Sequence, residues 1–215
     1  MQTLVTNEKI HVLGIAGSLR KGSYNRALLR AAQELAPKEM RITIFDNTQL
    51  SKIPLYDNDL REEGDPGSVQ VLKQEIEQAD ALLFALPEYN HSFSGVLKNA
   101  VDWASRPGNA SPLNGKPVAM LGAATGRSGT IRAQMHFRQV CATTNMLLLN
   151  KPLVQVINAA DQFNSDGKLI NQNARHFLGL LLEALLEWTR VIQYGKLVLE
   201  IGAENIMTPE DLQIV

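Results

Sequence analysis

The side chains best suited to chemistry in this sequence gather in a loop that follows the first apolar segment. Residues 14–25 read GIAGSLRKGSYN and run into an amphipathic segment. Backbone N–H groups and the positive end of a helix dipole attract an anion at such a place. Four polar side chains are candidates for contact with that anion: Ser18, Arg20, Ser23 and Asn25. The loop therefore predicts a phosphate site, and the simpler alternative is that its Ser and Asn residues only cap a helix.

The glycine spacing separates this loop from two common phosphate-binding motifs. A Walker A motif requires a lysine before its Ser or Thr, whereas Gly22 is followed directly by Ser23. The dinucleotide fingerprint has the spacing G-x-G-x-x-G, whereas the glycines here stand at 14, 17 and 22. The loop thus fits a terminal monophosphate better than a triphosphate or a pyrophosphate.

Two further loops suit contact with a planar ligand. Residues 86–95 read LPEYNHSFSG, and the candidates are Pro87, Glu88, Tyr89 and Asn90. Residues 122–130 read GAATGRSGT, where glycines permit close approach to the backbone and the candidates are Thr125 and Gly126. The alternatives are an ordinary loop with a helix cap for the first and a flexible glycine-rich turn for the second.

Alternating strands and helices are expected to position these loops. Short apolar runs predict strands at Ile10–Ile15, Arg41–Phe45, Ala81–Leu86, Val118–Ala123 and Met146–Leu149, the last continuing toward Ile157. Helix-period segments predict helices at Ser23–Ala36, Val69–Gln78, Ser94–Ser105, Gly129–Ala142 and Gln172–Tyr194, with a long surface loop at Asn47–Gly67. Nearly all-apolar strands between helices indicate a parallel sheet buried on both faces. We predict a flavodoxin-like three-layer α/β sandwich with a five-stranded parallel sheet in the order 2-1-3-4-5, in which the three loops share one crevice.

The length of 215 residues fits one domain better than two. We assign residues 1–194 to this domain and residues 195–215 to a C-terminal extension. Within the extension, the pattern predicts a strand at Lys196–Ile201 and a short helix capped at Thr208–Pro209.

Composition excludes several classes of function. The formal net charge of −1 provides no global attraction to nucleic acid or to an anionic membrane. No apolar run approaches the length of a transmembrane helix, and the first residues lack the pattern of a signal peptide. The single cysteine, Cys141, suits a reducing compartment, so we expect a cytoplasmic protein. The four histidines show no metal-ligand spacing, so we expect no metal site.

Taken together, the loops make the chain resemble the NADPH-dependent FMN reductase family, and especially its quinone, chromate and azo-dye reductase branch. The resemblance rests on GSLRKGSYN at 17–25, LPEYNHSFSGVLKNAVDWASRP at 86–107 and GRSGTIRAQMHFRQV at 126–140, and it extends through 150–152 to about Tyr194. It implies a flavodoxin-like fold, non-covalently bound FMN, and ping-pong transfer of hydride from NADPH or NADH through flavin N5 to a small acceptor. Quinones, chromate, azo compounds and free flavin all suit such a site.

The resemblance also implies roles for the candidate residues. Ser18, Arg20, Ser23 and Asn25 match the family's phosphate contacts, Pro87–Asn90 its flavin-ring loop, and Gly126 its third loop. No catalytic side chain is expected, because the flavin itself carries the chemistry. The sequence departs from the family at Ser94, Ala124 and Thr130, where Pro, Ser and Gly are frequent, and Thr125 is a candidate to supply the missing hydroxyl.

Two other classes of function stay open on the sequence. A non-catalytic electron carrier or redox-responsive interaction protein would use the same FMN loops. A phosphoester hydrolase or nucleotide-binding module would need a cluster of metal-binding carboxylates at the strand ends, and none is evident. We predict a homodimer or homotetramer for two reasons. Phe177–Ile192 has a broad apolar face, and the resemblance implies a flavin site completed by a neighbouring subunit.

Overall fold

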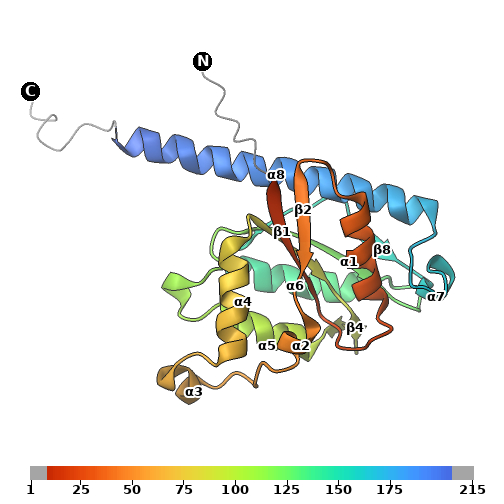
Figure 1. Cartoon of the computed structure of the whole chain (residues 1–215), viewed down its shortest axis with the longest axis horizontal. Coiled ribbons are helices and arrows are strands. Elements are labelled where there is room, and N and C mark those ends of the chain that lie inside the picture. The colour runs from red at the N-terminus through yellow and green to blue at the C-terminus, as the bar shows by residue number, and fades with distance from the viewer. Residues whose placement is uncertain (1–8, 205–215) are drawn as a thin grey trace, which may run out of the picture.

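A parallel sheet forms the centre of the protein (Figure 1). The computed structural model describes residues 9–204. The strands β2 (Met40–Ile44), β1 (Ile10–Ala16), β3 (Ala81–Ala85), β6 (Pro117–Ala123) and β7 (Leu147–Leu148) lie side by side in that order. All their pairings are parallel. The predicted flavodoxin-like order 2-1-3-4-5 is therefore confirmed.

The fifth position of the sheet is divided between two short strands. β7 pairs with Pro117–Val118 at the start of β6, and β8 (Val154–Val156) pairs with Leu121–Ala123 at its end. The chain between them includes Pro152, which has no N–H to donate to a ladder of hydrogen bonds. The single strand predicted from Met146 toward Ile157 is thus interrupted in its middle.

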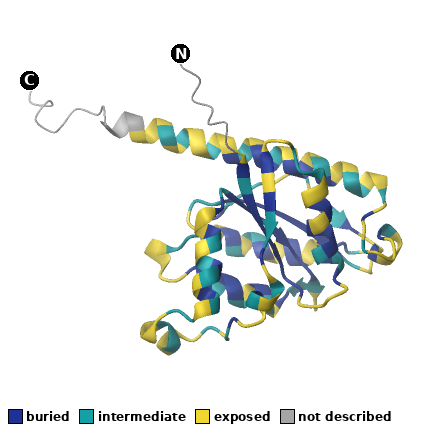
Figure 2. Cartoon of the chain, in the orientation of Figure 1, coloured by how far each residue is buried: buried dark blue, intermediate teal, exposed yellow. Residues whose placement is uncertain are grey.

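Successive strand residues point to opposite faces of the sheet and so build two cores. On one face, Val12 and Leu83 pack beneath α1 (Tyr24–Leu35) and α8 (Gln172–Glu204). On the other, Leu13 and Phe84 pack beneath three helices: α4 (Gly67–Gln78), α5 (Gly95–Ala104) and α6 (Ile131–Thr143). Figure 2 shows the buried strands between partly exposed helices. This burial on both faces explains why the strands read as nearly continuous apolar runs.

The region predicted as a long surface loop, Asn47–Gly67, contains two short helices. These are α2 (Asn47–Leu50) and α3 (Asn58–Glu63), and the side chains of Asp46 and Asp57 cap their first turns. The prediction of one long surface loop was wrong where these helices form, because Asp is a strong N-cap even before a segment too short to show helical periodicity. A further short helix, α7 (Ala159–Gln162), follows β8.

The last helix, α8, is 33 residues long and continues past its predicted end at Tyr194. The predicted strand at Lys196–Ile201 is therefore wrong. Gly195 costs a helix interior only about 1 kcal/mol relative to alanine, and neighbouring side chains hold the helix to the domain. Gln193 donates to the Asp80 carboxylate, and Lys196 donates to the backbone oxygen of Gly115. The predicted cap at Thr208–Pro209 lies outside the described residues, and the domain division at 194 stays a prediction that falls inside α8.

Candidate functional site

Three loops meet at the carboxyl edge of the sheet. They follow β1, β3 and β6, which are neighbours in the sheet and run parallel. Parallel neighbours end at the same edge, so the three loops predicted to share a crevice do lie together. Three sets of contacts then fix their relative positions.

The first loop presents backbone donors at the start of α1. Among the described residues, the N–H groups of residues 18–22 have no protein acceptor. Ser18 is buried and Arg20 is exposed. Ser23 caps α1, because its hydroxyl accepts a bond from the N–H of Arg26 at 3.4 Å. Five unbonded N–H groups before a 12-residue helix, with one guanidinium beside them, suit an anion.

Asn25 ties this loop to the end of β6. Its amide nitrogen donates to the Ala123 oxygen at 3.0 Å, and its amide oxygen accepts from the Ala123 N–H at 2.9 Å. The side chain is almost fully buried. Asn25, predicted as a phosphate contact, therefore has its amide engaged in joining the first and third loops.

Gly17 and Ser94 join the first and second loops. The Ser94 hydroxyl donates to the Gly17 oxygen at 2.6 Å and accepts from the N–H of Leu97 at the start of α5. A Cβ on Gly17 would lie only 2.8 Å from the Ser94 hydroxyl and 2.9 Å from the Pro87 ring. Only glycine allows the two loops to come this close.

The second loop forms a tight hairpin. β4 (Glu88–Tyr89) and β5 (Ser92–Phe93) pair antiparallel around Asn90 and His91. Both central residues have positive φ, 49° and 67°, as a type I′ turn requires. Tyr89 is 53% exposed and so presents its ring to solvent.

Glu88 fixes the hairpin to the start of α6. Its carboxylate accepts bonds from the N–H groups of Arg132 and Ala133 at 3.0 and 3.3 Å, and it pairs with the Arg132 guanidinium at 3.3 Å. Burial acts to raise the pKa of Glu88, but hydrogen bonds from Ala133, Ser128 and Arg132 outweigh it, so the pKa lies below its ordinary value. Glu88 is thus held as a carboxylate at the positive end of a helix.

The third loop leaves Thr125 and Gly126 exposed at the site. Its base is closely packed, because a Cβ on Gly122 would overlap the Thr130 hydroxyl. Thr130 itself is fully buried with φ of 70°. Glycine takes such a left-handed position at less cost than a residue with a side chain.

The structure thus brings all ten candidate residues to one edge of the sheet and separates their roles. Arg20, Tyr89, Thr125 and Gly126 are exposed to solvent. Asn25 and Glu88 position the loops through contacts with residues 98 and 44 positions away. Sequence reasoning missed these two roles and that of Ser94, because no local pattern identifies a partner so distant.

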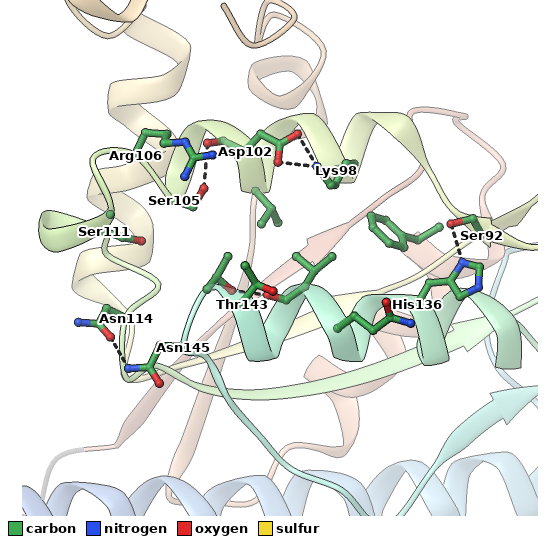
Figure 3. A pocket seen from close by; sticks show the side chains of 16 residues that line it. Ser92, Lys98, Asp102, Ser105, Arg106, Ser111, Asn114, His136, Thr143 and Asn145 are labelled. Atoms are coloured by element: carbon green, nitrogen blue, oxygen red, sulfur yellow. Dashed lines mark hydrogen bonds and ion pairs between the residues drawn. The ribbon is translucent and has the colours of Figure 1, made fainter. Parts of the chain in front are cut away.

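A cavity lies beside the loops rather than on them. It has a volume of about 670 Å³ and runs between α5 and α6 (Figure 3). Ser92 and His136 are bonded at one end, beside the hairpin, and the Lys98–Asp102 ion pair lies along α5. The other end reaches Asn114 and Asn145. This groove flanks the site but does not contain the anion donors.

Among the described residues, no group of three or more His, Cys, Asp or Glu side chains is placed to hold a metal ion. A search of the same residues finds no helix long and apolar enough to cross a membrane.

Comparison with known proteins agrees with this geometry. Residues 10–161, which contain all three loops, match the family described as NADPH-dependent FMN reductase. The chain belongs to the NADPH-dependent FMN reductase family. Both the resemblance predicted from the motifs and the assignment of this chain as a flavin-dependent reductase are thereby confirmed.

Relatives in the FMN reductase family are similar over most of this chain. An NAD(P)H-dependent FMN reductase of Pseudomonas aeruginosa is 48% identical over 86% of this chain and 97% of the relative. A quinone reductase of Escherichia coli is 42% identical over 68% of this chain and 77% of the relative. The solved flavoenzyme NAD(P)H:(acceptor) oxidoreductase FerB from Paracoccus denitrificans is 31% identical with a TM-score of 0.76, over 84% of this chain and 97% of that one.

The residues present fit the cofactor of this family. FMN ends in a single phosphate, which matches a loop with free N–H groups and one arginine but no P-loop lysine. The exposed hairpin and third loop leave an open edge on which a planar ring can lie. Ser18, Arg20 and the N–H groups of residues 18–22 would hold the phosphate, and Pro87–Asn90 with Thr125–Gly126 would border the ring.

Proposed function

We propose that this protein binds FMN at the three loops and uses NADPH or NADH to reduce small acceptors, quinones first. The observation that carries the proposal is the set of unbonded N–H groups before α1, placed beside an exposed hairpin at the carboxyl edge of the sheet. The names of the relatives as FMN and quinone reductases support the choice of acceptor. Chromate, azo compounds and free flavin are further acceptors of the same proposal.

The protein's own residues bind and orient rather than react. Bound FMN supplies reversible two-electron exchange between a nicotinamide and an acceptor, so no nucleophile or general base is required of the chain. Arg20 and the first loop neutralise the phosphate, while the hairpin carrying Tyr89 limits the space beside the ring. Glu88 holds that hairpin against α6 and so sets its distance from the third loop.

An open site shared in turn by donor and acceptor accounts for a ping-pong order. The ring-bordering residues Tyr89, Thr125 and Gly126 are exposed, so a wide range of flat acceptors can reach this edge. We further propose that the chain works in the cytoplasm and assembles as a homodimer or homotetramer. Residues 1–194 would form the catalytic domain in each copy.

An absorption experiment tests the proposal. The purified protein is scanned with added FMN, then anaerobically with NADPH or NADH, then with a quinone. Bound-flavin absorbance should bleach with the nicotinamide and return with the quinone. Flavin that binds but does not bleach would favour an electron carrier, and absence of flavin binding would remove FMN from the proposal.

Arg20→Ala tests the phosphate loop. Removal of one charge-assisted contact should weaken FMN binding by about 1–3 kcal/mol, measured by fluorescence titration. Arg41→Ala is the control, since Arg41 is exposed on β2 at the opposite end of the strand from the loops. Equal FMN affinity in the Arg20 variant and the native chain would remove Arg20 from the site.

A further inference from the structure

The helix α8 carries two separate apolar stripes. The inner stripe, which includes Leu178, Leu182 and Leu185, is buried against the sheet. The outer stripe faces away from the domain and is exposed at five apolar side chains. Their exposed fractions are 51% for Phe177, 38% for Leu180, 60% for Val191, 64% for Tyr194 and 47% for Val198.

The outer stripe repeats with the spacing of a coiled coil. Positions 177, 180, 184, 187, 191, 194 and 198 follow steps of three and four, and all are apolar except Glu187. This a/d pattern describes a seam that packs against one other helix. Packing on the sheet does not require it, because the inner stripe already supplies that contact.

The length of α8 also exceeds what the domain covers. The last residue of the inner stripe that is fully buried is Thr189, and the helix continues to Glu204. Figure 1 shows its C-terminal end projecting past the other elements. The exposed stripe continues onto this projecting end through Val191, Tyr194 and Val198.

The charges beside the stripe identify the partner. Glu183 and Arg190 flank it on the same side, seven residues apart. A parallel pair of two such helices would place Glu187 beside Glu187 within the seam. An antiparallel pair centred between residues 185 and 186 would instead bring Glu183 of each helix beside Arg190 of the other.

We propose that the outer face of α8 binds the same face of a second copy, as an antiparallel two-helix seam. Phe177 of one copy would meet Tyr194 of the other, and Leu180 would meet Val191. Ala184 leaves room opposite Glu187. The projecting end, near Val198, would lie over the first turn of the partner helix at Asn173. Each residue pair occurs twice, as a two-fold axis requires.

The arrangement is physically compatible with the rest of the domain. Each sheet lies on the inner side of its own α8, so the two domains would be on opposite sides of the seam. The seam from 177 to 198 is about 30 Å long at 1.5 Å per residue. The seam rests on the homo-oligomer proposed above and names its contact surface. Its test measures molecular mass, so the result does not depend on whether the protein reduces quinones.

The first test is Val191→Glu, measured in the full chain by light scattering after gel filtration at micromolar concentration. The mass should fall to half that of the native protein, because a charge would face Leu180 of the partner twice. Leu199→Glu is the matched control, since Leu199 is 74% exposed on the same helix, next to Val198 in sequence, but lies off the stripe. It should keep the native mass. Far-UV circular dichroism confirms that both variants fold.

A native chain that elutes at 23.7 kDa, or a Val191→Glu variant of native mass, would overturn the proposal. Equal loss of mass in the Leu199→Glu control would also overturn it, because the stripe would then not be the contact.

A charge exchange tests the antiparallel direction. Arg190→Glu alone and Glu183→Arg alone should each weaken the homodimer by placing like charges together. An equimolar mixture of the two variants should regain the native mass, because every flanking pair is then Glu with Arg. A mixture that stays at half mass would rule out the antiparallel seam.

Discussion

Glu88 shows how one residue can be placed in the correct loop and still have an unexpected role. Its neighbours in sequence suggested a ring contact, while the structure places its carboxylate at the first turn of α6. A carboxylate there stabilises both the helix end and the hairpin. The contribution of Glu88 to the free energy of unfolding should therefore depend on pH.

Glu88→Gln should lower the free energy of unfolding of the flavin-free protein by about 1–2 kcal/mol at pH 7. The pKa of Glu88 is lowered in the folded state, so its contribution is complete above the ordinary carboxyl pKa and is lost as pH falls through the lowered value. Urea titrations at pH 7 and in acid should therefore show a difference that shrinks in acid. Glu62→Gln, at an exposed carboxylate, should change stability by less than about 0.5 kcal/mol. A loss independent of pH would contradict this account.

Gly17→Ala should destabilise the protein by about 1–3 kcal/mol through overpacking. The new methyl group would press on Ser94 and Pro87 at under 3.0 Å, at the point where two loops cross. Gly22→Ala is the control in the same loop, because no atom lies within 4 Å of its Cβ position. Thermal unfolding of both flavin-free variants compares them, and equal melting temperatures would disprove the crowding at Gly17.

The candidate residues were predicted from the sequence, but the contacts that each of them makes within the protein were not. Local spacing identifies the loop at 17–25 because a strand, glycines and a helix start occur together. The bond between Asn25 and Ala123 joins residues 98 positions apart, and no spacing rule reports it. The Ser23 hydroxyl caps α1, as the simpler alternative expects, and its contact with a phosphate stays a prediction.

At the scale of elements, the hairpin at the site gives a prediction of its own. His91 occupies a left-handed turn position with φ of 67°, which costs a residue with a side chain roughly 1 kcal/mol. His91→Gly should therefore stabilise the flavin-free protein by about 0.5–1 kcal/mol in urea titrations. Ser92→Gly, one residue later on β5, should destabilise it, because glycine is unfavourable in a strand. Destabilisation by His91→Gly would show that the His91 side chain makes a contact that matters more than the turn.

The elements predicted best are those whose burial is complete. The three central strands, β1, β3 and β6, have apolar runs on both faces, and their order followed from alternation with helices. The wrong predictions of helix and strand bounds occur where the residues are only partly buried. Pro152 interrupts the edge strand, and Gly195 suggested an end to α8 that side-chain bonds from Gln193 and Lys196 override.

At the scale of the whole molecule, the reactivity of the Cys141 thiol measures how often the protein unfolds. Cys141 lies on the buried face of α6, and burial raises the pKa of its thiol to about 12, so almost no thiolate forms at pH 8. A thiol reagent such as Ellman's should label the native protein only as fast as it unfolds, and added FMN should slow labelling by stabilising the folded state. The urea-unfolded chain is the control and should react at once. Rapid labelling in native buffer would mean that α6 opens locally.

The bond pair between Asn25 and Ala123 also has a consequence for biosynthesis. The loop at the start of α1 is bonded through Asn25 to Ala123, a residue synthesised almost a hundred positions later. The strand that carries Ala123, β6, in turn pairs with β8 at Val154–Val156. A chain still emerging from the ribosome would therefore have its first loop bonded to the second loop but not yet to β6. The cofactor would find its full set of contacts only once synthesis had passed the final strand, so it would stabilise the finished domain without guiding its early assembly.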